Sequence, residues 1–504
     1  MTDKRNKEKW YDAFIRTISK YEKVNMIMDR MKELANSLKE LEEQLVICTK
    51  CGMCQSVCPL FDRTRKEADV ARGKLALIDG LGNNLFTNPD GVSERLNRCL
   101  LCGSCAANCP SGVNVVEIFI KARAILAEFK GLSSAKKLIF RKMLSNPASF
   151  DKLTEWAGRF QNIFTKKDKN AQGTSCVRVV SPLFGDRHFL PMSDKPFHNF
   201  LPNSDNNFNQ LSANENISKH LINTSAGKSG IKVAFFTGCI IDKIFPRIGQ
   251  DVIDVFEFHG VGLYIPKNQG CCGIPALASG DMKSFEKLVE YHIDLFSEEK
   301  FDYLVTACAT CTSTIKKLWS SIYKGSASKT REKIQELSNK TLDINQFLVN
   351  KVNLLNSLEN KKDIGDKLDG NNGDDIDCNN GDYTDCNNGD NIKTITYHDP
   401  CHLKKFLGVF KEPRILIKAS GSRLVEMEGS DKCCGMGGSF NLYHYKISSE
   451  IGQIKSQNIA DTNCDVVATG CPACMVQISD VLAKKNLDIK VCHPIELYAE
   501  MLRK

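Results

Sequence analysis

The second half of the chain alternates short apolar runs with longer amphipathic stretches. The apolar runs are rich in β-branched residues and lie at 232–237, 261–265, 303–307, 394–397, 424–427, 466–469 and 489–492. Stretches with helical periodicity lie between them, at 241–258, 281–297, 312–321, 442–460 and 474–484. Alternation of strands and helices is typical of α/β units with parallel sheets. We therefore expect small parallel sheets from Lys232 onward.

The N-terminal segment, residues 1–47, has a different pattern. Its apolar residues recur at helical intervals, with Lys and Glu between them: Tyr21, Val24, Met28, Met31, Ala35, Leu38 and Leu45. This spacing predicts one long helix. Such an apolar stripe either packs on its own protein or docks a partner chain, and the sequence leaves both interpretations open.

Three segments join these regions. Residues 48–130 form a cysteine-dense block that ends in a predicted helix from Val115 to Phe129. Residues 131–230 are helical in pattern up to about Phe164 and then rich in Asn, Ser, Lys and Pro, which predicts an extended linker. Residues 359–393 are rich in Asn, Asp and Gly and contain DCNNGD twice, so we expect a disordered surface insertion. An acidic metal-binding loop is the alternative, but the spacing is not that of an EF-hand.

Composition constrains the compartment and the chemistry. The 504 residues are 42% hydrophobic and 25% charged, which is ordinary for a globular protein. No stretch resembles a signal peptide or a membrane span, so we expect a cytoplasmic chain without a direct membrane span. In that compartment 23 cysteines favour metal binding over disulfides. The net charge of +8 is spread along the chain and not interleaved with aromatic residues, which argues against nucleic-acid binding.

The cysteines near the N-terminus form two runs with the spacing C-x2-C-x2-C-x3-C-P. This spacing is that of bacterial two-cluster ferredoxins, in which the fourth cysteine of each run ligates the other cluster. We therefore expect one [4Fe–4S] cluster on Cys48, Cys51, Cys54 and Cys109, and a second on Cys99, Cys102, Cys105 and Cys58. A pair of zinc ribbons is the alternative, although zinc sites use pairs of C-x2-C.

Ten later cysteines form an internal repeat, in which 31 residues separate the first cysteine from a Cys-Cys-Gly triplet and a C-x2-C pair follows. The first copy, called here the first CCG site, contains Cys239, Cys271, Cys272, Cys308 and Cys311. The second CCG site contains Cys401, Cys433, Cys434, Cys471 and Cys474. Most of these thiols follow predicted strands, so each set should converge at the carboxyl edge of a sheet. Soft thiolate ligands select an iron–sulfur cluster or zinc. We expect one or two further [4Fe–4S] clusters here, cubane or non-cubane, with structural zinc as the alternative.

The remaining polar and thiol residues receive structural interpretations. His398, Asp399 and His402 surround Cys401, and we interpret them as hydrogen-bonding and turn-capping residues, with a catalytic dyad as the alternative. His493 is interpreted in the same way. Other cysteines are expected to be buried (Cys464, Cys492), to lie in the insertion without a ligand role (Cys378, Cys386), or have no assigned role (Cys176). No G-x-G-x-x-G follows a predicted strand, so we expect no flavin or nicotinamide site on this chain.

The order of these motifs resembles the iron–sulfur subunits of glycolate oxidase and respiratory D-lactate dehydrogenases. It also resembles the C subunit of anaerobic glycerol-3-phosphate dehydrogenase and the D subunit of heterodisulfide reductase. The stretches that carry the resemblance are SDKPF, FFTGCIIDKIFP, NQGCCGIPALASGD, LVTACATCTSTI, HDPCHLKK, CCGMGGSFN and GCPACMVQI. It covers roughly residues 45–503, apart from the insertion and the 166–230 linker, and the N-terminal helix lies outside it.

Together these patterns and the resemblance imply an α+β multidomain protein with a helical two-cluster ferredoxin domain and two repeated α/β domains. The expected parts are an N-terminal helix (1–47), the ferredoxin-type domain (48–130), a helical segment and linker (131–230), the first Cys-Cys-Gly domain (231–350), the insertion (359–393) and the second Cys-Cys-Gly domain (394–504).

The resemblance implies an electron-transfer subunit. A partner FAD protein would oxidise a 2-hydroxy acid, D-lactate or glycolate, and this chain would pass the electrons to a quinone or another carrier, with membrane association only through partners. No catalytic residue is expected on this chain. Because both CCG sites keep all five cysteines, the alternative is a heterodisulfide-reductase-type protein that cleaves a disulfide at a non-cubane cluster.

Overall fold

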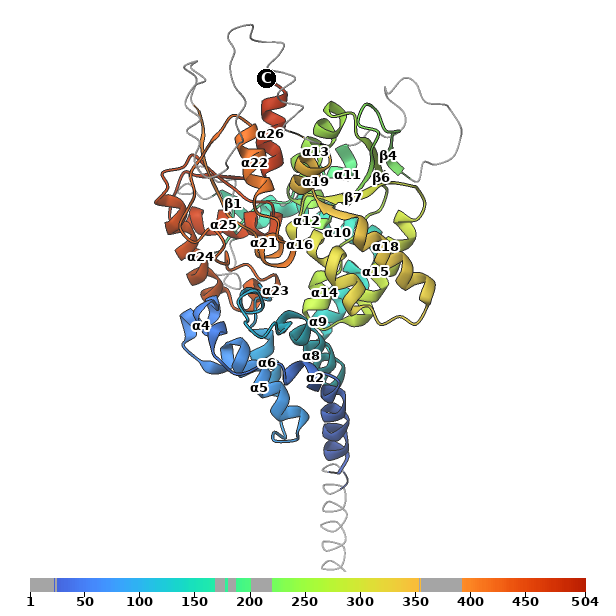
Figure 1. The fold of residues 1–504 in the computed structure, drawn as a ribbon, viewed down its shortest axis with the longest axis vertical. Coiled ribbons are helices and arrows are strands. Elements are labelled where there is room, and N and C mark those ends of the chain that lie inside the picture. The colour runs from blue at the N-terminus through green and yellow to red at the C-terminus, as the bar shows by residue number, and fades with distance from the viewer. Residues whose placement is uncertain are drawn as a thin grey trace, which may run out of the picture. The chain divides into compact units, whose positions relative to one another are not determined.

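The computed structural model describes residues 22, 25–167, 177–179, 187–200, 220–352, 354 and 392–504. The described residues are mostly helical, with three small sheets, and this confirms the predicted α+β fold class. They group into two compact units (Figure 1). The predicted positions Tyr21 and Val24, the insertion from 359 to 391, and Cys176, Cys378 and Cys386 lie outside the described residues.

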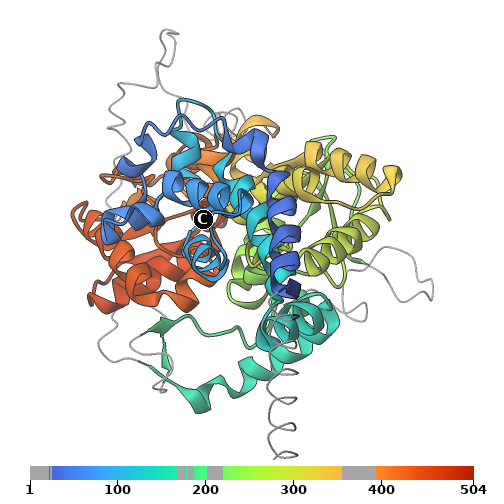
Figure 2. The same cartoon turned by 90° about the horizontal axis from the view of Figure 1, so that it is seen from below.

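The first unit contains the chain up to Ser145 together with Gly273–Leu288 and Gly435–Ile451. Its N-terminal part is helical over residues 25–39 and then, after a turn, over α2 (Glu42–Leu45). The single helix predicted for 1–47 is therefore wrong at residues 40 and 41, where a tight turn buries Leu41, and at residues 46 and 47, which form a second turn. The 25–39 helix, dark blue in Figure 2, packs on its own unit. Its Arg30 donates to the Phe129 carbonyl at 2.8 Å.

The apolar face of this helix is shorter than predicted. Met31, Ala35 and Leu38 are buried, whereas Met28 is 48% exposed.

The rest of the first unit is helical, without a strand among its described residues. Its elements are α3 (Met53–Ser56), α4 (Pro59–Thr64), η1 (Glu67–Asp69), α5 (Ala71–Gly82), α6 (Asp90–Asn97), α7 (Ser104–Ala107), α8 (Val115–Lys130), α9 (Ser134–Lys137), the π-helix η2 (Leu138–Leu144), α14 (Ile274–Ala278) and α23 (Ser439–Tyr443). Helix α8 begins at the predicted residue and buries Ile118, Phe119 and Ala122 in the core.

The second unit contains two sheets of related topology. In the first, β5 (Lys232–Phe235), β6 (Gly262–Pro266), β7 (Tyr303–Thr306) and β8 (Thr341–Asp343) are parallel in the order β6-β5-β7-β8. In the second, β9 (Thr394–Tyr397), β10 (Arg423–Leu424), β11 (Val466–Ala468) and β12 (Lys490–Cys492) are parallel in the order β10-β9-β11-β12. The internal repeat in the sequence is therefore a repeat of strand order. All seven predicted strands are present at or near their predicted positions.

One edge of the first sheet departs from the prediction of parallel sheets. Strand β4 (His220–Asn223) pairs with β6 in the antiparallel direction. This strand comes from the segment predicted as a linker, so it adds to the edge without the helical crossover that a parallel strand requires.

The helices of the second unit are more divided than predicted. The helix expected over 241–258 is two helices, α12 (Cys239–Lys243) and α13 (Pro246–Phe258), because Pro246 lacks an N–H and occupies the first turn of the second. The helix expected over 312–321 comprises α16 (Ala309–Ser313), the π-helix η3 (Thr314–Leu318) and α17 (Trp319–Ile322). The helix expected over 442–460 is divided between α23 and α24 (Tyr445–Ala460). Helices α15 (Met282–Phe296) and α25 (Pro472–Lys484) match their predicted ranges closely.

Several elements were not predicted. They include α11 (Phe197–Phe200), α18 (Ser328–Lys340), α19 (Ile344–Asn350), α21 (Cys401–Leu407), α22 (Glu412–Ala419) and α26 (Pro494–Leu502). The two copies of the repeat pack together within this unit, with α13 against α26 and α19 against α22 (Figure 1). At this contact His259 Nε2 lies 3.0 Å from the Tyr498 hydroxyl.

The segment between the ferredoxin-type block and the first sheet also packs on the second unit. It contains α10 (Pro147–Phe164), β1 (Thr165–Lys167), β2 (Val177–Val179) and β3 (His188–Phe189), of which the strands form a small antiparallel sheet. Phe197 is buried edge-on against Phe235 of β5, with ring centroids 6.4 Å apart. The described part of this linker is therefore anchored to the core.

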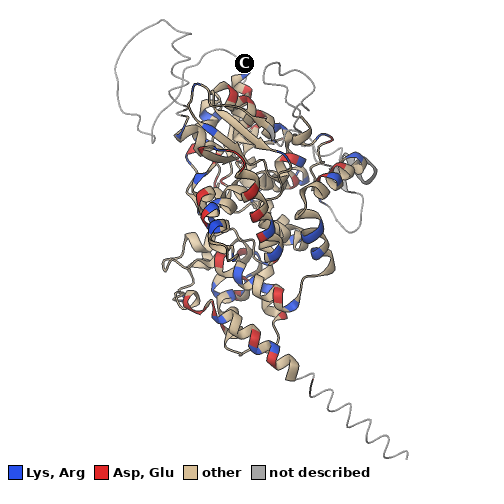
Figure 3. Cartoon of the chain, turned by 90° about the vertical axis from the view of Figure 1, so that its right-hand side faces the viewer, with Lys and Arg blue, Asp and Glu red and all other residues tan. Residues whose placement is uncertain are grey.

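Charged side chains of both signs are interspersed along the helices of both units (Figure 3). Within the described part of the chain, no helix combines the length and the apolar character that a bilayer crossing requires.

Candidate iron–sulfur sites

Both cysteine runs of the first unit adopt the same unusual backbone. Lys50 and Leu101, each directly before the second cysteine of its run, have φ of 58° and 53°. Gly52 and Gly103, directly after that cysteine, have φ of 87° and 72°. Residues in this left-handed region turn the chain so sharply that successive cysteines of one loop face a common centre, and glycine adopts it without strain. The shared spacing therefore corresponds to a shared loop geometry.

These loops line two cavities. Cys58, Cys99, Cys102 and Cys105 line one of them, and Cys48, Cys51, Cys54, Cys105 and Cys109 line the other. The fourth cysteine of each run therefore lies with the first three of the other run, which is the pairing that we expect for two ferredoxin-type clusters. Cys105 borders both cavities, so the two sites are immediate neighbours.

Local capping and ion pairs fix the walls of these cavities. Cys58 caps α4, where its sulfur accepts from the Phe61 N–H at 3.5 Å, and Pro59 occupies the first turn of that helix. Arg72 donates to the Lys50 carbonyl at 3.1 Å and is itself held by Glu67 at 2.7 Å. The first cavity wall is therefore pinned by a helix cap and the second by an arginine.

A buried arginine holds the second loop from behind. Arg123 on α8 is 5% exposed and donates to the carbonyls of Cys99 and Ala278, each at 2.8 Å. Its guanidinium also donates to the Leu96 carbonyl at 3.1 Å. This residue was not singled out in the sequence, because an arginine inside a predicted amphipathic helix carries no signal of its own.

Two thiols of the first unit lie where burial disfavours the thiolate form. Burial raises the pKa of Cys58 to about 11 and also raises the pKa of Cys105. Protonated thiols at these positions are poor ligands, and a bound cation lowers such values because it stabilises the thiolate. The clustered thiols therefore fit a metal cluster better than they fit free thiols.

The first CCG site lies at the carboxyl ends of β5 and β7, where the strand order reverses. Cys239 begins α12 after β5, and Cys308 caps α16 after β7. The Cys271 thiol contacts those of Cys239 and Cys272, and the Cys311 thiol contacts those of Cys272 and Cys308. All five thiols thus form one continuous group. Ligand sites in open α/β sheets form at this reversal point.

Two packing features hold the first CCG site in shape. Trp319, fully buried, donates its indole N–H to the Cys272 carbonyl at 3.0 Å. Gly238 has a φ of 74°, and a Cβ at this position would lie 3.1 Å from the Cys311 sulfur. The glycine therefore permits both the turn into α12 and the close approach of the backbone to the thiols.

The second CCG site repeats this placement. Cys401 begins α21 after β9, and Cys471 caps α25 after β11. The sulfurs of Cys434 and Cys474 are 3.5 Å apart, and hydrogen bonding with Cys433 and Cys474 lowers the pKa of Cys434. All five cysteines of this site are buried.

The two CCG sites are in contact. The Cys308 and Cys471 thiols lie within hydrogen-bonding contact, and the Thr310 hydroxyl lies 3.4 Å from the Cys471 sulfur. The Ala309 N–H donates to the Gly470 carbonyl at 3.0 Å, which joins the backbones of the two loops. The sequence did not predict this contact, because it depends on how the two copies pack.

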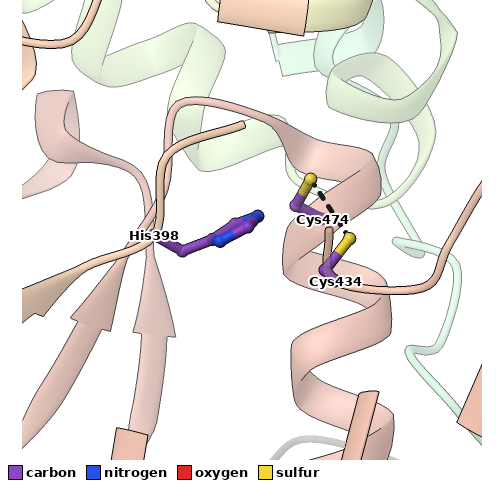
Figure 4. Close-up of side chains that lie close together, drawn as sticks. All are labelled: His398, Cys434 and Cys474. Atoms are coloured by element: carbon purple, nitrogen blue, oxygen red, sulfur yellow. Dashed lines mark hydrogen bonds between the residues drawn. The ribbon is translucent and has the colours of Figure 1, made fainter. Parts of the chain in front are cut away.

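The polar residues around Cys401 have separate roles. Asp399 is bound by Arg414 at 2.8 Å and 3.0 Å, and His402 Nδ1 lies 3.2 Å from the Thr310 hydroxyl. His398 points toward Cys434 and Cys474 (Figure 4). His493 caps α26 as predicted, where its Nδ1 accepts from the Ile495 N–H at 3.2 Å.

Two further cysteines and one lysine complete the surroundings. Cys464 and Cys492 are buried, as expected for small core residues. Lys455, 1% exposed, donates to the Gly429 and Ser430 carbonyls at 2.5 Å and 3.2 Å. It was not predicted, because a lone lysine in an amphipathic helix normally faces water.

Comparison with known proteins agrees with this division of the chain. Residues 44–113 match a 4Fe-4S dicluster domain, and residues 233–316 and 395–479 each match a cysteine-rich domain.

Similar proteins include a probable iron–sulfur subunit, a lactate utilization protein and a reductase subunit. The probable glycolate oxidase iron–sulfur subunit of Bacillus subtilis is 24% identical over 476 residues, which is 92% of this chain and 95% of that protein. Lactate utilization protein A 1 of Bacillus mycoides is 27% identical over 271 residues, 54% of this chain and 97% of that protein. The B subunit of the fumarate reductase (CoM/CoB) of Methanothermobacter marburgensis is 33% identical over 285 residues, 56% of this chain but only 49% of that protein.

The matched domains coincide with the two thiol-rich regions of the structure. The chain is therefore an iron–sulfur protein with a 4Fe-4S dicluster domain and a pair of cysteine-rich domains, related to the glycolate oxidase iron–sulfur subunit and to lactate utilization protein A.

Proposed function

We propose that this chain is the electron-transfer subunit of a flavin-dependent dehydrogenase complex that oxidises a 2-hydroxy acid, D-lactate or glycolate. A partner FAD protein would carry out the oxidation, and the chain would pass the electrons to a quinone or another carrier. The observation that carries the proposal is the ordered grouping of eighteen cysteines into four ligand sets, two in each unit. [4Fe–4S] clusters bound at these sets supply one-electron transfer.

The proposed ligands are those expected from the cysteine spacing. Within the first unit they are Cys48, Cys51, Cys54 and Cys109 for one cluster, and Cys99, Cys102, Cys105 and Cys58 for the other. Within the second unit they are the five cysteines of each CCG site. The contact between Cys308 and Cys471 leaves no protein layer between the two CCG sites.

One exposed segment of the first unit, residues 46–53, is suited to a redox partner. Cys51 is exposed, and apolar residues beside it in the sequence are exposed too: Val46 is 73%, Ile47 is 45% and Met53 is 53% exposed. Exposed apolar residues that lie together mark interaction surfaces. We propose that the flavoprotein docks here, beside the cluster held by Cys48, Cys51, Cys54 and Cys109.

The experiment is anaerobic affinity purification of the full chain from its native host. We expect a flavoprotein to co-purify, and D-lactate or glycolate to bleach both the flavin and the iron–sulfur absorbance. Met53→Glu should weaken recovery of the flavoprotein, whereas Leu85→Glu, at a 74% exposed position in the α5–α6 loop, should leave it unchanged. Clusters that stay oxidised in the presence of a reduced flavoprotein would contradict the proposal.

A second candidate function rests on the contact between the CCG sites. Two complete thiol sets that meet at Cys308 and Cys471 are also suited to cleavage of a disulfide, which consumes two electrons and two protons and releases two thiols. In that case the electrons arrive through the first unit and leave on the disulfide substrate. Reoxidation of the reduced, flavin-free chain by a disulfide, with release of two thiols for each disulfide, would favour this function over the first.

A further inference from the structure

The second CCG site contains a ligand-type atom that is not a thiol. The ring of His398 and the sulfurs of Cys434 and Cys474 offer three ligand atoms that all lie within 4.8 Å of one another. All three residues are buried, and the imidazole points at the pair of sulfurs (Figure 4). Nitrogen and thiolate ligands at such separations are typical of a shared metal centre.

The hydrogen bonding of His398 shows which nitrogen is available. Its Nδ1 lies 3.0 Å from the Ser430 carbonyl oxygen, and because a carbonyl can only accept, Nδ1 carries the proton. In the neutral ring Nε2 is then a bare lone pair. This Nε2 is buried, and the group that it faces is the Cys434 thiol, one of the proposed ligands of this site. A metal-bound histidine shows the same arrangement, with one nitrogen donating to a carbonyl and the other free for the metal.

The orientation of the ring is fixed from several sides. The backbone N–H of His398 donates to the Ala468 carbonyl at 2.9 Å, which ties the residue to β11. The Ser430 carbonyl, which accepts the hydrogen bond from the His398 ring, also accepts one from Lys455 at 3.2 Å. His398 itself is fully buried. The lone pair is therefore held toward the thiols before any ligand binds.

At the equivalent sequence position, the first CCG site lacks this imidazole. Three residues before Cys239, where His398 precedes Cys401, the chain has Phe236, whose ring cannot bind a metal. A histidine does lie beside Phe236, with ring centroids 5.1 Å apart, but Nε2 of this His292 already accepts from the Gly270 N–H at 3.1 Å. The two copies of the repeat therefore differ in whether a histidine nitrogen is available as a metal ligand at this position.

We propose that Nε2 of His398 is an iron ligand at the second CCG site, so that the cluster there has mixed thiolate and imidazole ligation while the first CCG site is all-thiolate. The inference rests on the proposed function only in requiring a cluster at the second site. An imidazole is neutral where a thiolate is negative, and replacement of thiolate by histidine raises the potential of an iron–sulfur cluster. Electrons that reach the CCG sites would then collect at the second one.

The test is pulsed electron paramagnetic resonance on the reduced, full-length chain with ¹⁵N-labelled histidine. We expect a strong ¹⁵N coupling in the wild type that is absent from His398→Phe. This variant gives the second CCG site the residue type that Phe236 provides at the equivalent position of the first. His444→Gln, in the first unit, should retain the coupling. His398→Cys should keep the iron and lower the midpoint potential of one cluster, because it restores a thiolate ligand.

The iron count and the ¹⁵N coupling together distinguish failure of the His398 proposal from failure of the proposed function. A wild-type chain with iron at both CCG sites but no strong ¹⁵N coupling overturns ligation by His398 and leaves the electron-transfer function intact. A coupling that persists in His398→Phe overturns it as well. A chain without iron at the CCG sites, counted per chain, contradicts the His398 proposal and also the proposed function. Loss of the coupling in His398→Phe with retained iron at the other sites supports the assignment.

Discussion

Cys308 and Cys471 occupy equivalent places in the two copies of the repeat and meet each other directly. Each is the N-cap of the helix that contains the second cysteine of its C-x2-C pair. The backbone angles φ and ψ are −140° and 109° for Cys308, and −141° and 109° for Cys471. Their thiols are within hydrogen-bonding contact. The repeat thus brings the two CCG sites into direct contact through these thiols. An electron could therefore pass from one site to the other over a short distance.

Thr310 is a polar residue at this contact, and its removal should change the potential of one cluster. Its hydroxyl lies 3.4 Å from the Cys471 sulfur. Hydrogen bonds to cluster sulfurs raise the reduction potential. We expect Thr310→Val to lower one midpoint potential without loss of iron, and Thr310→Ser to match the wild type. A redox titration followed by electron paramagnetic resonance measures both, and identical midpoints for the valine variant and the wild type would contradict the role.

Cys58 should be required for the cluster of the opposite loop. It lines the cavity of Cys99, Cys102 and Cys105 and not that of its own run. Cys58→Ser should therefore cost about four irons per chain and lower the stability of the first unit, because ligation contributes to folding there. Cys464→Ala, a buried cysteine outside every ligand set, is the matched control. An unchanged iron count in Cys58→Ser would show that the pairing is wrong.

Lys455 should raise the potential of the second CCG site. Burial lowers the pKa of its ammonium group to about 8, although the nearby cysteines of this site raise it. Because this pKa is above 7, the side chain is mostly charged at neutral pH. A buried positive charge favours the reduced, more negative state of a neighbouring cluster. We expect Lys455→Met to lower one midpoint potential, and the exposed Lys446→Met to leave all midpoints unchanged. A Lys455→Met midpoint at or above the wild-type value argues against this role.

Asp343 should make the stability of the second unit depend on pH. Burial raises the pKa of its carboxyl group to about 7, whereas in the unfolded chain the value is about 3.9. Between these values the folded state holds a proton that the unfolded state has released, so stability falls as the pH rises from about 4 to about 7.

The substitution Asp343→Asn tests this pH dependence. In the wild type, Asp343 accepts from the Asn345 N–H at 2.9 Å. The asparagine amide keeps an oxygen that can accept this bond, and it does not ionise. We expect the variant to be more stable than the wild type by about 1–4 kcal/mol at pH 8 and similar to it near pH 4. Denaturant unfolding of the holoprotein at both pH values measures the difference, and parallel stability curves would refute the assignment.

The sequence predicted the sheets well, because their strands are short, apolar and β-branched and recur with the cysteine motifs. It did not predict β8, which has only three residues, or α18, whose buried residues are few. It also joined α12 to α13, although Pro246 begins α13. Short elements and helix breaks depend on tertiary packing more than on local periodicity.

The candidate sites were predictable in their members but not in their surroundings. Spacing alone groups the cysteines, since ligand loops are local. The contact of Cys308 with Cys471 and the direction of the His398 ring were not predictable. The ring is oriented by Ser430, which is 32 residues away, and no local pattern encodes such a partner.

The measurement that tests the central claim most directly is the iron content of the anaerobically purified chain, combined with a redox titration of its clusters. An electron-transfer chain with clusters at all four thiol sets should hold about 16 irons, and each cluster should accept and release an electron reversibly. About 8 irons, with the CCG sites filled by zinc or empty, would contradict the account, because electrons could then not pass through the second unit.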